Sequence, residues 1–201
     1  TNATTFAARV AAMSDGQLTL KVFSGGELVP PFGVEDAVEQ GTAEIGHSTP
    51  YYAASKNTAL HYFSAVPFGM SFTEINAWIL YSGGMDLWDK VQDQFGLKGL
   101  PAGNTGTQAG GWFNKEIESV DDFKGLKMRI PGLGGQVLAK LGASTVSLPG
   151  GQIYENLVSG TIDATEWVGP YNDYFMKFYE AAKYYYTGGM HEPGAQLSLT
   201  S

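Results

Sequence analysis

The sequence predicts an α/β fold made of two lobes with a ligand cleft between them. Segments with helical apolar spacing alternate with short segments of period-two spacing along most of the chain. Strands separated by single helices indicate parallel sheets. Two helix–glycine–strand patterns, at residues 34–45 and 153–164, resemble each other and therefore indicate two similar lobes. In such a protein the ligand binds between the lobes, at the carboxyl ends of strands.

The composition is that of a globular protein and argues against several classes of function. The chain has 201 residues, 43% of them hydrophobic, which is enough for one large domain or two smaller lobes. A formal net charge of −8 without a basic patch argues against nucleic-acid binding. The absence of cysteine excludes disulfides, thiolate metal sites and cysteine nucleophiles. No apolar run in the sequence approaches the roughly 20 residues that span a bilayer.

The two ends of the sequence indicate a fragment of a longer protein. The chain begins at Thr1 without an initiator methionine, and residues 196–201 resemble a strand that is cut midway. No secretory signal is visible. Because we expect a fragment, this missing signal is uninformative about where the protein is located.

In the first half of the chain, the expected elements follow from apolar spacing and from the residues that end each element. Phe6, Val10 and Met13 share one face of a helix that ends at residues 14–16, Ser-Asp-Gly. Residues 17–23 alternate polar and apolar side chains, which predicts a strand. The other expected elements are helices at 34–39, 72–81 and 85–95 and strands at 43–47 and 97–104.

In the second half, glycine marks the ends of most expected elements. The helix at 134–141 is opened by Gly132 and Gly134 and closed by Gly142. The helix at 150–159 is closed by Gly160. The other expected elements are strands at 108–114, 126–130, 144–148, 163–167 and 183–187 and a helical stretch that ends at residue 182.

Two charged residues stand where expected strands meet Gly/Pro breaks. Arg129 precedes Ile-Pro-Gly, and Glu166 with Trp167 precedes Val-Gly-Pro. A break of this kind ends regular structure, and the loop that follows is where a scaffold usually presents binding groups. Arg129 is either a fork-shaped clamp for a ligand carboxylate or a surface or ion-paired arginine. The pair indicates a small charged ligand.

Glu166 has three interpretations on sequence alone. It ligates a metal ion, acts as a general base, or is a strand-end acid paired with a basic neighbour. Glu192 lies at a turn, and Gln108 offers an amide oxygen. Ligands that are all oxygen suit a hard cation such as sodium, calcium or magnesium.

Other motifs indicate no further chemistry. His47, His61 and His191 lack metal-ligand spacing, so zinc is not expected and structural roles are favoured. Residues 132–135 are rich in glycine but lack the Lys-Ser/Thr of a phosphate-binding loop. The Gly-x-Ser-x-Gly signature of many hydrolases is absent.

Several stretches of the sequence resemble the periplasmic solute-binding proteins of tripartite ATP-independent periplasmic (TRAP) transporters. The motifs occur in the family's order and cover essentially the whole chain. They are most similar to the subgroup that binds 2-oxo or 2-hydroxy acids together with a metal cation. The stretches are residues 26–30, 65–70, 124–132, 148–154, 162–173 and 191–194.

The resemblance implies roles for five residues around one ligand. Arg129 would bind the substrate carboxylate, and Gln108 would contact both ligand and cation. Glu166, the main-chain carbonyl of Trp167, and Glu192 would hold the cation, which is sodium or calcium. Trp167 would also contact the substrate.

The resemblance also implies a division of the chain. Residues 1–106 would form part of lobe I, residues 107–188 lobe II, and residues 189–201 a return segment to lobe I. Tyr52 and Phe68 would line the lobe I side of the cleft. Chains of the family begin earlier and end later, so we expect the first strand and the C-terminal helices to lie outside this segment.

The function that the resemblance implies is capture without chemistry. The protein would be periplasmic, would bind a small monocarboxylate such as pyruvate or lactate, and would deliver it to the membrane permease subunits. The full-length chain would form a homodimer. Two alternatives stay open: a ligand-sensing domain that never meets a transporter, and a metal-assisted enzyme with Glu166 as base.

Overall fold

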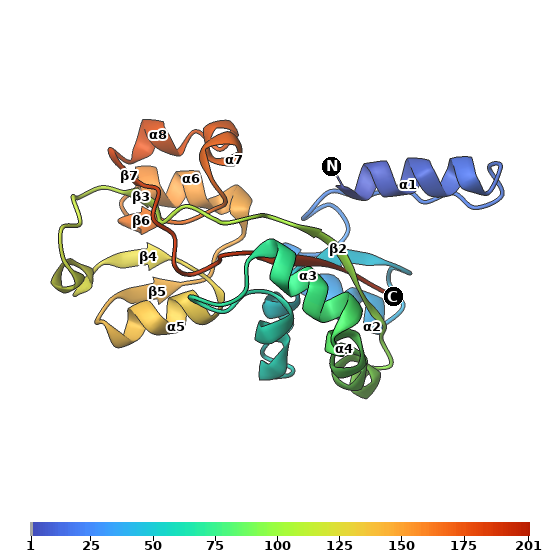
Figure 1. Ribbon diagram of the computed structural model, residues 1–201. Coiled ribbons are helices and arrows are strands. Elements are labelled where there is room, and N and C mark those ends of the chain that lie inside the picture. Colours follow the sequence, from blue (N-terminus) through green and yellow to red (C-terminus); the bar gives the residue numbers. More distant parts are fainter. Residues whose placement is uncertain (1) are drawn as a thin grey trace.

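Two β-sheets, each with its own helices, form the two lobes of the protein (Figure 1). The structure, a computed structural model, describes residues 2–201. Lobe I contains a three-stranded sheet of order β1-β8-β2, and lobe II a five-stranded sheet of order β5-β4-β6-β3-β7. The prediction of a two-lobed α/β fold is confirmed.

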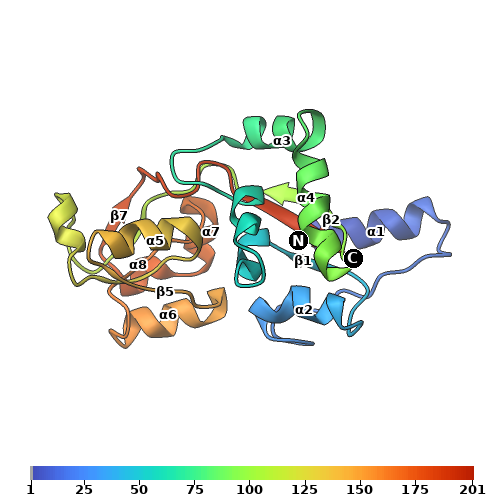
Figure 2. The ribbon, with the colours of Figure 1, turned by 90° about the horizontal axis from the view of Figure 1, so that it is seen from below.

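The sheet of lobe I is antiparallel throughout. Strand β8 (Gln196–Thr200) lies between β1 (Gly46–Ser48) and β2 (Gly99–Asn104) and runs against both. The parallel pairing expected here is therefore wrong, because β8 returns from the other lobe instead of following a crossover helix. Helices α2 (Val34–Glu39), α3 (Phe72–Tyr81) and α4 (Gly84–Gln92) pack against one face of this sheet, seen from that side in Figure 2.

The sheet of lobe II is mixed. Strand β4 (Lys127–Arg129) is parallel to β5 (Ser144–Val146) and to β6 (Ala164–Thr165). Single helices connect these three strands, as the parallel prediction requires. Strand β3 (Gly111–Phe113) enters from lobe I and is antiparallel to both β6 and β7 (Tyr184–Tyr186), which corrects the expectation for this half of the sheet.

Helices cover both faces of the lobe II sheet. Helix α5 (Gly132–Lys140) lies on one side, and α6 (Gly150–Val158), α7 (Pro170–Phe175) and α8 (Phe178–Ala181) lie on the other (Figure 1). The core is accordingly split in two. Met128 and Leu138 belong to the cluster beneath α5, whereas Ile153 and Phe178 belong to the cluster beneath α6 and α8.

Two extended segments, residues 105–110 and 187–195, connect the lobes and bond to each other. The N–H of Thr105 donates to the carbonyl of Ala195 (2.9 Å), and the N–H of Gln108 to that of Glu192 (3.0 Å). A further hydrogen bond joins lobe I to the second of these segments: the N–H of Phe68 donates to the carbonyl of Met190 (2.8 Å). The expected lobe boundaries, after residues 106 and 188, fall within these segments and stay a prediction.

The two similar sequence patterns have the same local structure. Gly41 follows the end of helix α2 and Gly160 the end of helix α6, and each glycine has φ = 72°. This left-handed conformation closes a helix most easily at glycine. After each glycine the chain enters a strand, β1 in lobe I and β6 in lobe II.

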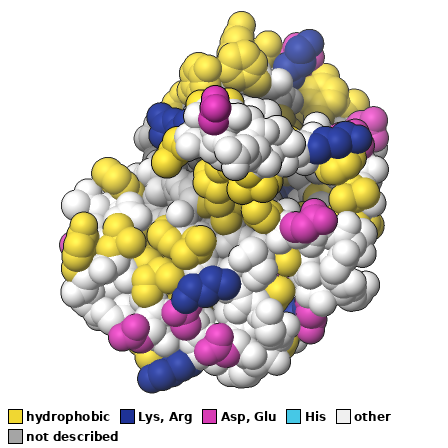
Figure 3. Space-filling model, turned by 90° about the vertical axis from the view of Figure 1, so that its right-hand side faces the viewer, with side chains coloured by type: hydrophobic (Ala, Val, Ile, Leu, Met, Phe, Trp, Pro, Cys, Tyr) yellow, Lys and Arg dark blue, Asp and Glu magenta, His cyan; other side chains and the backbone are white. Residues whose placement is uncertain are grey.

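The N-terminal region differs from the sequence prediction. Helix α1 (Asn2–Met13) is longer than expected and lies beside lobe I, at the end of the molecule that faces the viewer in Figure 3. Residues 17–23 form no strand, and Leu18 is 55% exposed. An alternating pattern makes a strand only when a neighbouring strand supplies hydrogen bonds. No strand among residues 2–201 pairs with this segment.

Short 3₁₀ helices complete the structure. Among residues 2–201, no helix combines the length and the apolar character needed to cross a membrane. The 3₁₀ helices are η1 (Pro31–Gly33), η2 (Pro50–Ala53), η3 (Thr58–Phe63), η4 (Asp93–Phe95) and η5 (Val120–Phe123).

The contact between β3 and β6 depends on a glycine. Gly111 has φ = 119°, and a Cβ atom placed on it would lie 2.3 Å from the carbonyl oxygen of Thr165. That oxygen belongs to the backbone and cannot move without displacing β6. The residue after Thr165 is Glu166, so this close approach also sets the position of a candidate site residue.

We predict that Gly111→Ala lowers the free energy of unfolding by about 2 kcal/mol or more, through overpacking and backbone strain. Urea denaturation measures this change. The matched control is Gly151→Ala in α6, because a Cβ atom there meets nothing within 4 Å. The control should be neutral or stabilising by about 0.5–1 kcal/mol. Equal effects at the two positions would contradict the close-approach argument.

Candidate functional site

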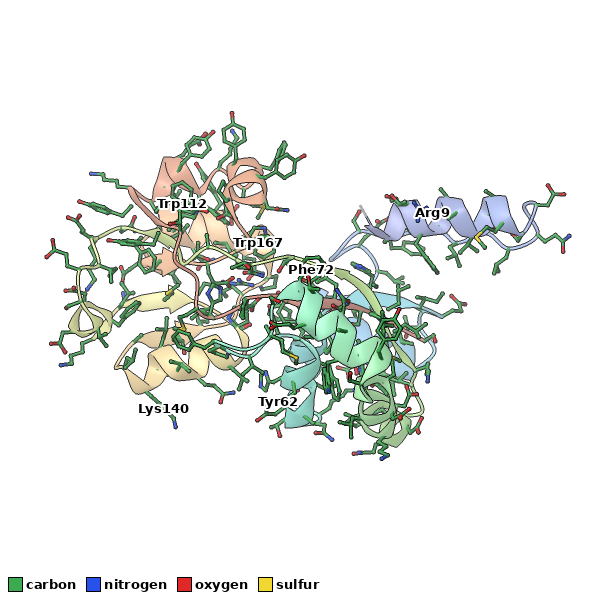
Figure 4. The ribbon with its side chains drawn as sticks, viewed as in Figure 1. Arg9, Tyr62, Phe72, Trp112, Lys140 and Trp167 are labelled. Carbon is green, nitrogen blue, oxygen red and sulfur yellow. The ribbon has the colours of Figure 1, made fainter. Side chains whose placement is uncertain are left out.

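A cavity of about 530 Å³ lies between the two lobes. Tyr51 and Tyr52 line it from η2 of lobe I, and Arg129, Glu166 and Trp167 line it from lobe II. Trp167 lies between the lobes in Figure 4. The connecting segments contribute Thr105, Gln108, Glu192 and Ala195, and the sheet of lobe I contributes further wall.

Parallel pairing of β4 and β6 brings Arg129 and Glu166 together. Arg129 is the last residue of β4 and pairs in register with Thr165, the last residue of β6. The N–H of Glu166 then donates to the carbonyl of Arg129 (3.3 Å). The carboxyl ends of neighbouring parallel strands thus present a cation and an anion at one edge of the sheet.

Arg129 is almost fully buried, with 1% of its surface exposed, yet each part of its guanidinium has a partner. Nη1 forms an ion pair with the Glu166 carboxylate, Nε donates to the carbonyl of Leu148 (3.1 Å), and Nη2 donates to the Tyr52 hydroxyl (3.4 Å). The Trp167 ring lies 5.3 Å from the guanidinium carbon. Burial lowers the pKa of Arg129, but Glu166, Tyr52 and Tyr51 together outweigh burial, so the pKa is raised.

Three buried side chains, Glu166, His191 and Glu192, lie next to this arginine and are called the acidic group below. Ligand atoms of Glu166, His191 and Glu192 lie within 4.8 Å of one another. The Nε2 atom of His191 is 3.4 Å from Oε2 of Glu166, and this hydrogen bond with the nearby carboxylates raises the His191 pKa against the opposing effect of burial. Glu192 accepts hydrogen bonds from Gln108 Nε2 (2.6 Å) and from the Tyr51 hydroxyl.

Glu192 binds a proton unusually tightly. Burial and then repulsion from Glu166 raise the pKa of the Glu192 carboxyl from 4.5 to about 7, against the opposing effects of His191, Tyr51 and Arg129. The raised pKa indicates that the negative charges of Glu166 and Glu192 are not fully neutralised by the positive groups around them.

The available donor set fits a hard cation. The Oε1 atom of Gln108 is buried and has no hydrogen-bond partner among residues 2–201. This amide oxygen and the carboxylates of Glu166 and Glu192 are the ligand type that sodium and calcium prefer. A cation held by these residues would also relieve the repulsion between the two acids.

The structure places most of the predicted site residues around the cavity. Tyr52, Gln108, Arg129, Glu166, Trp167 and Glu192 all line it. Phe68 does not: its side chain is 83% exposed, and its backbone is left-handed with φ = 57°. The functional roles of these residues stay predictions. The ion-paired interpretation that the sequence left open for Glu166 is also present, with Arg129 as its partner.

Two residues of the site were not predicted from the sequence. His191 was set aside because the histidines lack metal-ligand spacing, and its position next to Glu192 was the available signal. Tyr51 precedes the predicted Tyr52 and contacts Glu192 instead of Arg129. Neighbouring residues in a tight 3₁₀ turn can both face a site, which strand alternation would forbid.

Comparisons with known proteins agree on one family. The pattern of the bacterial extracellular solute-binding protein family 7 matches residues 1–201. The chain is 49% identical over 197 residues to a monocarboxylate 2-oxoacid-binding periplasmic protein of Nostoc sp., covering 98% of this chain and 54% of that one. No more than about half of that curated relative's length is therefore represented here.

Two solved structures are similar to this chain in both fold and sequence. A TRAP periplasmic solute-binding protein of Pseudoalteromonas atlantica, with bound sodium and pyruvate, has a TM-score of 0.96 and 47% identity over 99% of this chain and 60% of that one. The protein of Colwellia psychrerythraea, with bound calcium and pyruvate, has a TM-score of 0.95 and 49% identity, with the same coverage.

We predict that the stability of the chelator-treated protein falls as the pH rises from 4.5 to about 7. The folded state holds the Glu192 proton more tightly than the unfolded state, so the contribution is complete below 4.5 and is lost as the pH passes 7. The raised pKa corresponds to about 3 kcal/mol. Denaturant unfolding across this pH range measures the change.

Glu192→Gln should remove most of this pH dependence, whereas Glu116→Gln, at an exposed position in lobe II, should leave it unchanged. A Glu192→Gln protein with the wild-type pH profile would contradict the assignment of the proton to Glu192.

Proposed function

The chain belongs to the bacterial extracellular solute-binding protein family 7, and on that premise we propose that it captures a small 2-oxo or 2-hydroxy monocarboxylate together with a metal cation. The capture takes place in the periplasm, and the ligand passes to the membrane permease subunits of a TRAP transporter. The observation that carries the proposal is a buried arginine opposite two buried carboxylates in one cavity.

The arginine is suited to the carboxylate of the ligand. A guanidinium offers two parallel N–H groups that match the two oxygens of a carboxylate. Arg129 is held in place by Leu148 and Tyr52, so less side-chain entropy is lost when a ligand binds. A small acid offers few contacts, and its charge is the feature that a site can recognise most strongly.

The acidic group is suited to the second oxygen of the ligand through a cation. In their ionised forms, neither Glu166 nor Glu192 can bind a keto oxygen directly, because a carboxylate is only an acceptor. A sodium or calcium ion between them and the ligand would satisfy the two carboxylates, Gln108 Oε1 and the keto or hydroxy oxygen. The relatives from P. atlantica and C. psychrerythraea hold pyruvate with sodium and with calcium, respectively.

An enzyme at this site is less well supported. A general base must be free to reach a substrate proton. One Glu166 oxygen is paired with Arg129 and the other with His191, and Glu192 is held by Gln108. The family is one of solute-binding proteins. Incubation with pyruvate or lactate and the cation should therefore return the acid unchanged; product formation would contradict the proposal.

We predict that Arg129→Ala weakens pyruvate binding by about 100-fold or more, because a bidentate charge-assisted contact is lost. Isothermal titration calorimetry on the full-length protein, in calcium and in sodium, measures the affinity. The matched control is Lys127→Ala, which removes an exposed cation from the same strand. Normal pyruvate binding by Arg129→Ala would refute the assigned role.

We also predict that Glu166→Gln weakens pyruvate binding mainly through lost cation affinity, because an amide replaces a charged ligand. Titrating the cation at fixed pyruvate should show a shifted cation curve, and raising the cation concentration should restore pyruvate binding in part. A variant whose pyruvate affinity falls equally at all cation concentrations would contradict this division of roles.

The ligand-sensing alternative is separated from transport by uptake. Vesicles that contain the permease subunits should accumulate labelled pyruvate only when the binding protein is added. Binding of pyruvate without any stimulation of uptake would favour the sensing domain. A homodimer of the full-length chain stays a prediction, and size-exclusion chromatography with light scattering tests it.

A further inference from the structure

The loop from Trp167 to Gly169 carries one group of the proposed cation site on its backbone. The carbonyl of Trp167 accepts no hydrogen bond from residues 2–201, whereas the carbonyls of Glu166 and Val168 on either side of it both accept one. Trp167 and Val168 both line the cavity. A backbone carbonyl can ligate a cation only if the peptide group is turned the right way, so something must fix its orientation.

The carboxylate of Asp173 accepts hydrogen bonds from this loop. Its Oδ1 atom accepts the N–H of Val168 (3.1 Å) and of Gly169 (3.0 Å), and its Oδ2 atom accepts the indole N–H of Trp112 (3.0 Å). Asp173 has no exposed surface. It stands on α7, whereas Trp112 stands on β3, labelled within lobe II in Figure 4. The carboxylate thus joins a helix, a strand and the loop.

The hydrogen bond from the N–H of Val168 to Asp173 also fixes the direction in which the carbonyl of Trp167 points. The carbonyl of Trp167 and the N–H of Val168 belong to one peptide group, which is planar and trans. In a trans peptide the C=O and N–H bonds point in opposite directions. By holding the N–H of Val168, Asp173 therefore turns the carbonyl of Trp167 away from itself.

The next peptide group is held at both ends. Its N–H, on Gly169, donates to Asp173, and its carbonyl, on Val168, accepts the N–H of Ala109 (2.9 Å). Ala109 follows Gln108, whose amide is a second candidate ligand. One carboxylate thereby fixes the Trp167 loop relative to the segment that carries Gln108.

We propose that Asp173 is the positioning residue that aims the main-chain carbonyl of Trp167 at the bound cation. The inference rests on the proposed function, and it adds a residue that touches neither ligand nor cation. Residues that orient metal ligands from outside the coordination sphere typically change metal affinity 10- to 100-fold when they are replaced.

A simpler role for Asp173 is that of a helix cap. Gly169 is the N-cap of α7, and an acid in the first turn often accepts the N-cap N–H. That role accounts for the Gly169 bond alone. The bonds to Val168 and to the Trp112 indole lie outside the helix, and α7 has only six residues to stabilise.

The three hydrogen-bond partners of Asp173 require a carboxylate at this position. All three partners are N–H donors, so both oxygens of the side chain must accept. Burial raises the pKa of Asp173 overall, and the N–H donors of Val168, Trp112 and Gly169 offset part of this rise. Asparagine would keep one oxygen for the loop but would direct an NH₂ group at the indole N–H.

The test compares Asp173→Asn, Trp112→Phe and the double variant in the full-length protein. Calcium is titrated by calorimetry at saturating pyruvate. Asp173→Asn should weaken calcium binding roughly 10- to 100-fold. Trp112→Phe keeps both loop bonds and should cost less, about 3-fold. The double variant should recover part of the Asp173→Asn loss, because the two donors no longer face each other.

Two further measurements separate positioning from stability. Leu157→Ala, in the core beneath α6, should destabilise lobe II without changing calcium affinity. Terbium in place of calcium gives luminescence sensitised by Trp167, and Asp173→Asn should lower it at saturating terbium. If Asp173→Asn does not fold, Trp112→Phe takes its place in the test. A weaker calcium affinity with a lower terbium signal in Trp112→Phe would support the positioning role, and wild-type values of both would overturn it.

Unchanged calcium affinity in Asp173→Asn, or an equal loss in Leu157→Ala, would overturn the positioning role and leave a helix cap. If the wild-type protein binds neither calcium nor sodium in the presence of pyruvate, the proposed function itself fails, and the role of Asp173 fails with it.

Discussion

The ion pair between Arg129 and Glu166 is the interaction on which the rest of the site depends. Both residues are 1% exposed, so each charge has lost nearly all contact with water. The effective cost of burying an ion is several kcal/mol, and removing one member of a buried pair costs about 3–5 kcal/mol. The carbonyl of Leu148, the Tyr52 hydroxyl and His191 are therefore required partners, since they satisfy the remaining donors and acceptors.

The fold brings these groups together by two different means. Parallel pairing of β4 with β6 places Arg129 and Glu166 side by side at one sheet edge. The two connecting segments, which bond to each other, bring Gln108 and Glu192 over that edge. The connections between the lobes thus supply half of the site, so a hinge movement would change the distances within the acidic group itself.

How far the sequence predicts this structure depends on whether a residue's surroundings are local. The helices at 72–81 and 150–158 and the glycine stops at 41 and 160 follow from spacing and backbone preference, which are local properties. Arg129 and Glu166 were identifiable because Gly/Pro breaks follow them. Periodicity predicts a strand at 17–23 that does not form, and it does not predict the antiparallel β8 or the position of Phe68. All three depend on partners far away in the chain. His191 was missed for the same reason, because its meaning comes from Glu166, 25 residues earlier.

Under the proposed function, the same ion pair makes ligand and cation depend on each other. Glu166 cannot give its full charge to a cation while it neutralises Arg129. A ligand carboxylate that pairs with Arg129 replaces Glu166 there and frees it for the cation. The cation in turn binds the ligand's second oxygen and offsets the repulsion between Glu166 and Glu192. Either partner alone leaves a buried charge unpaired, so the site favours the two together, and that requirement selects acids with an oxygen next to the carboxylate.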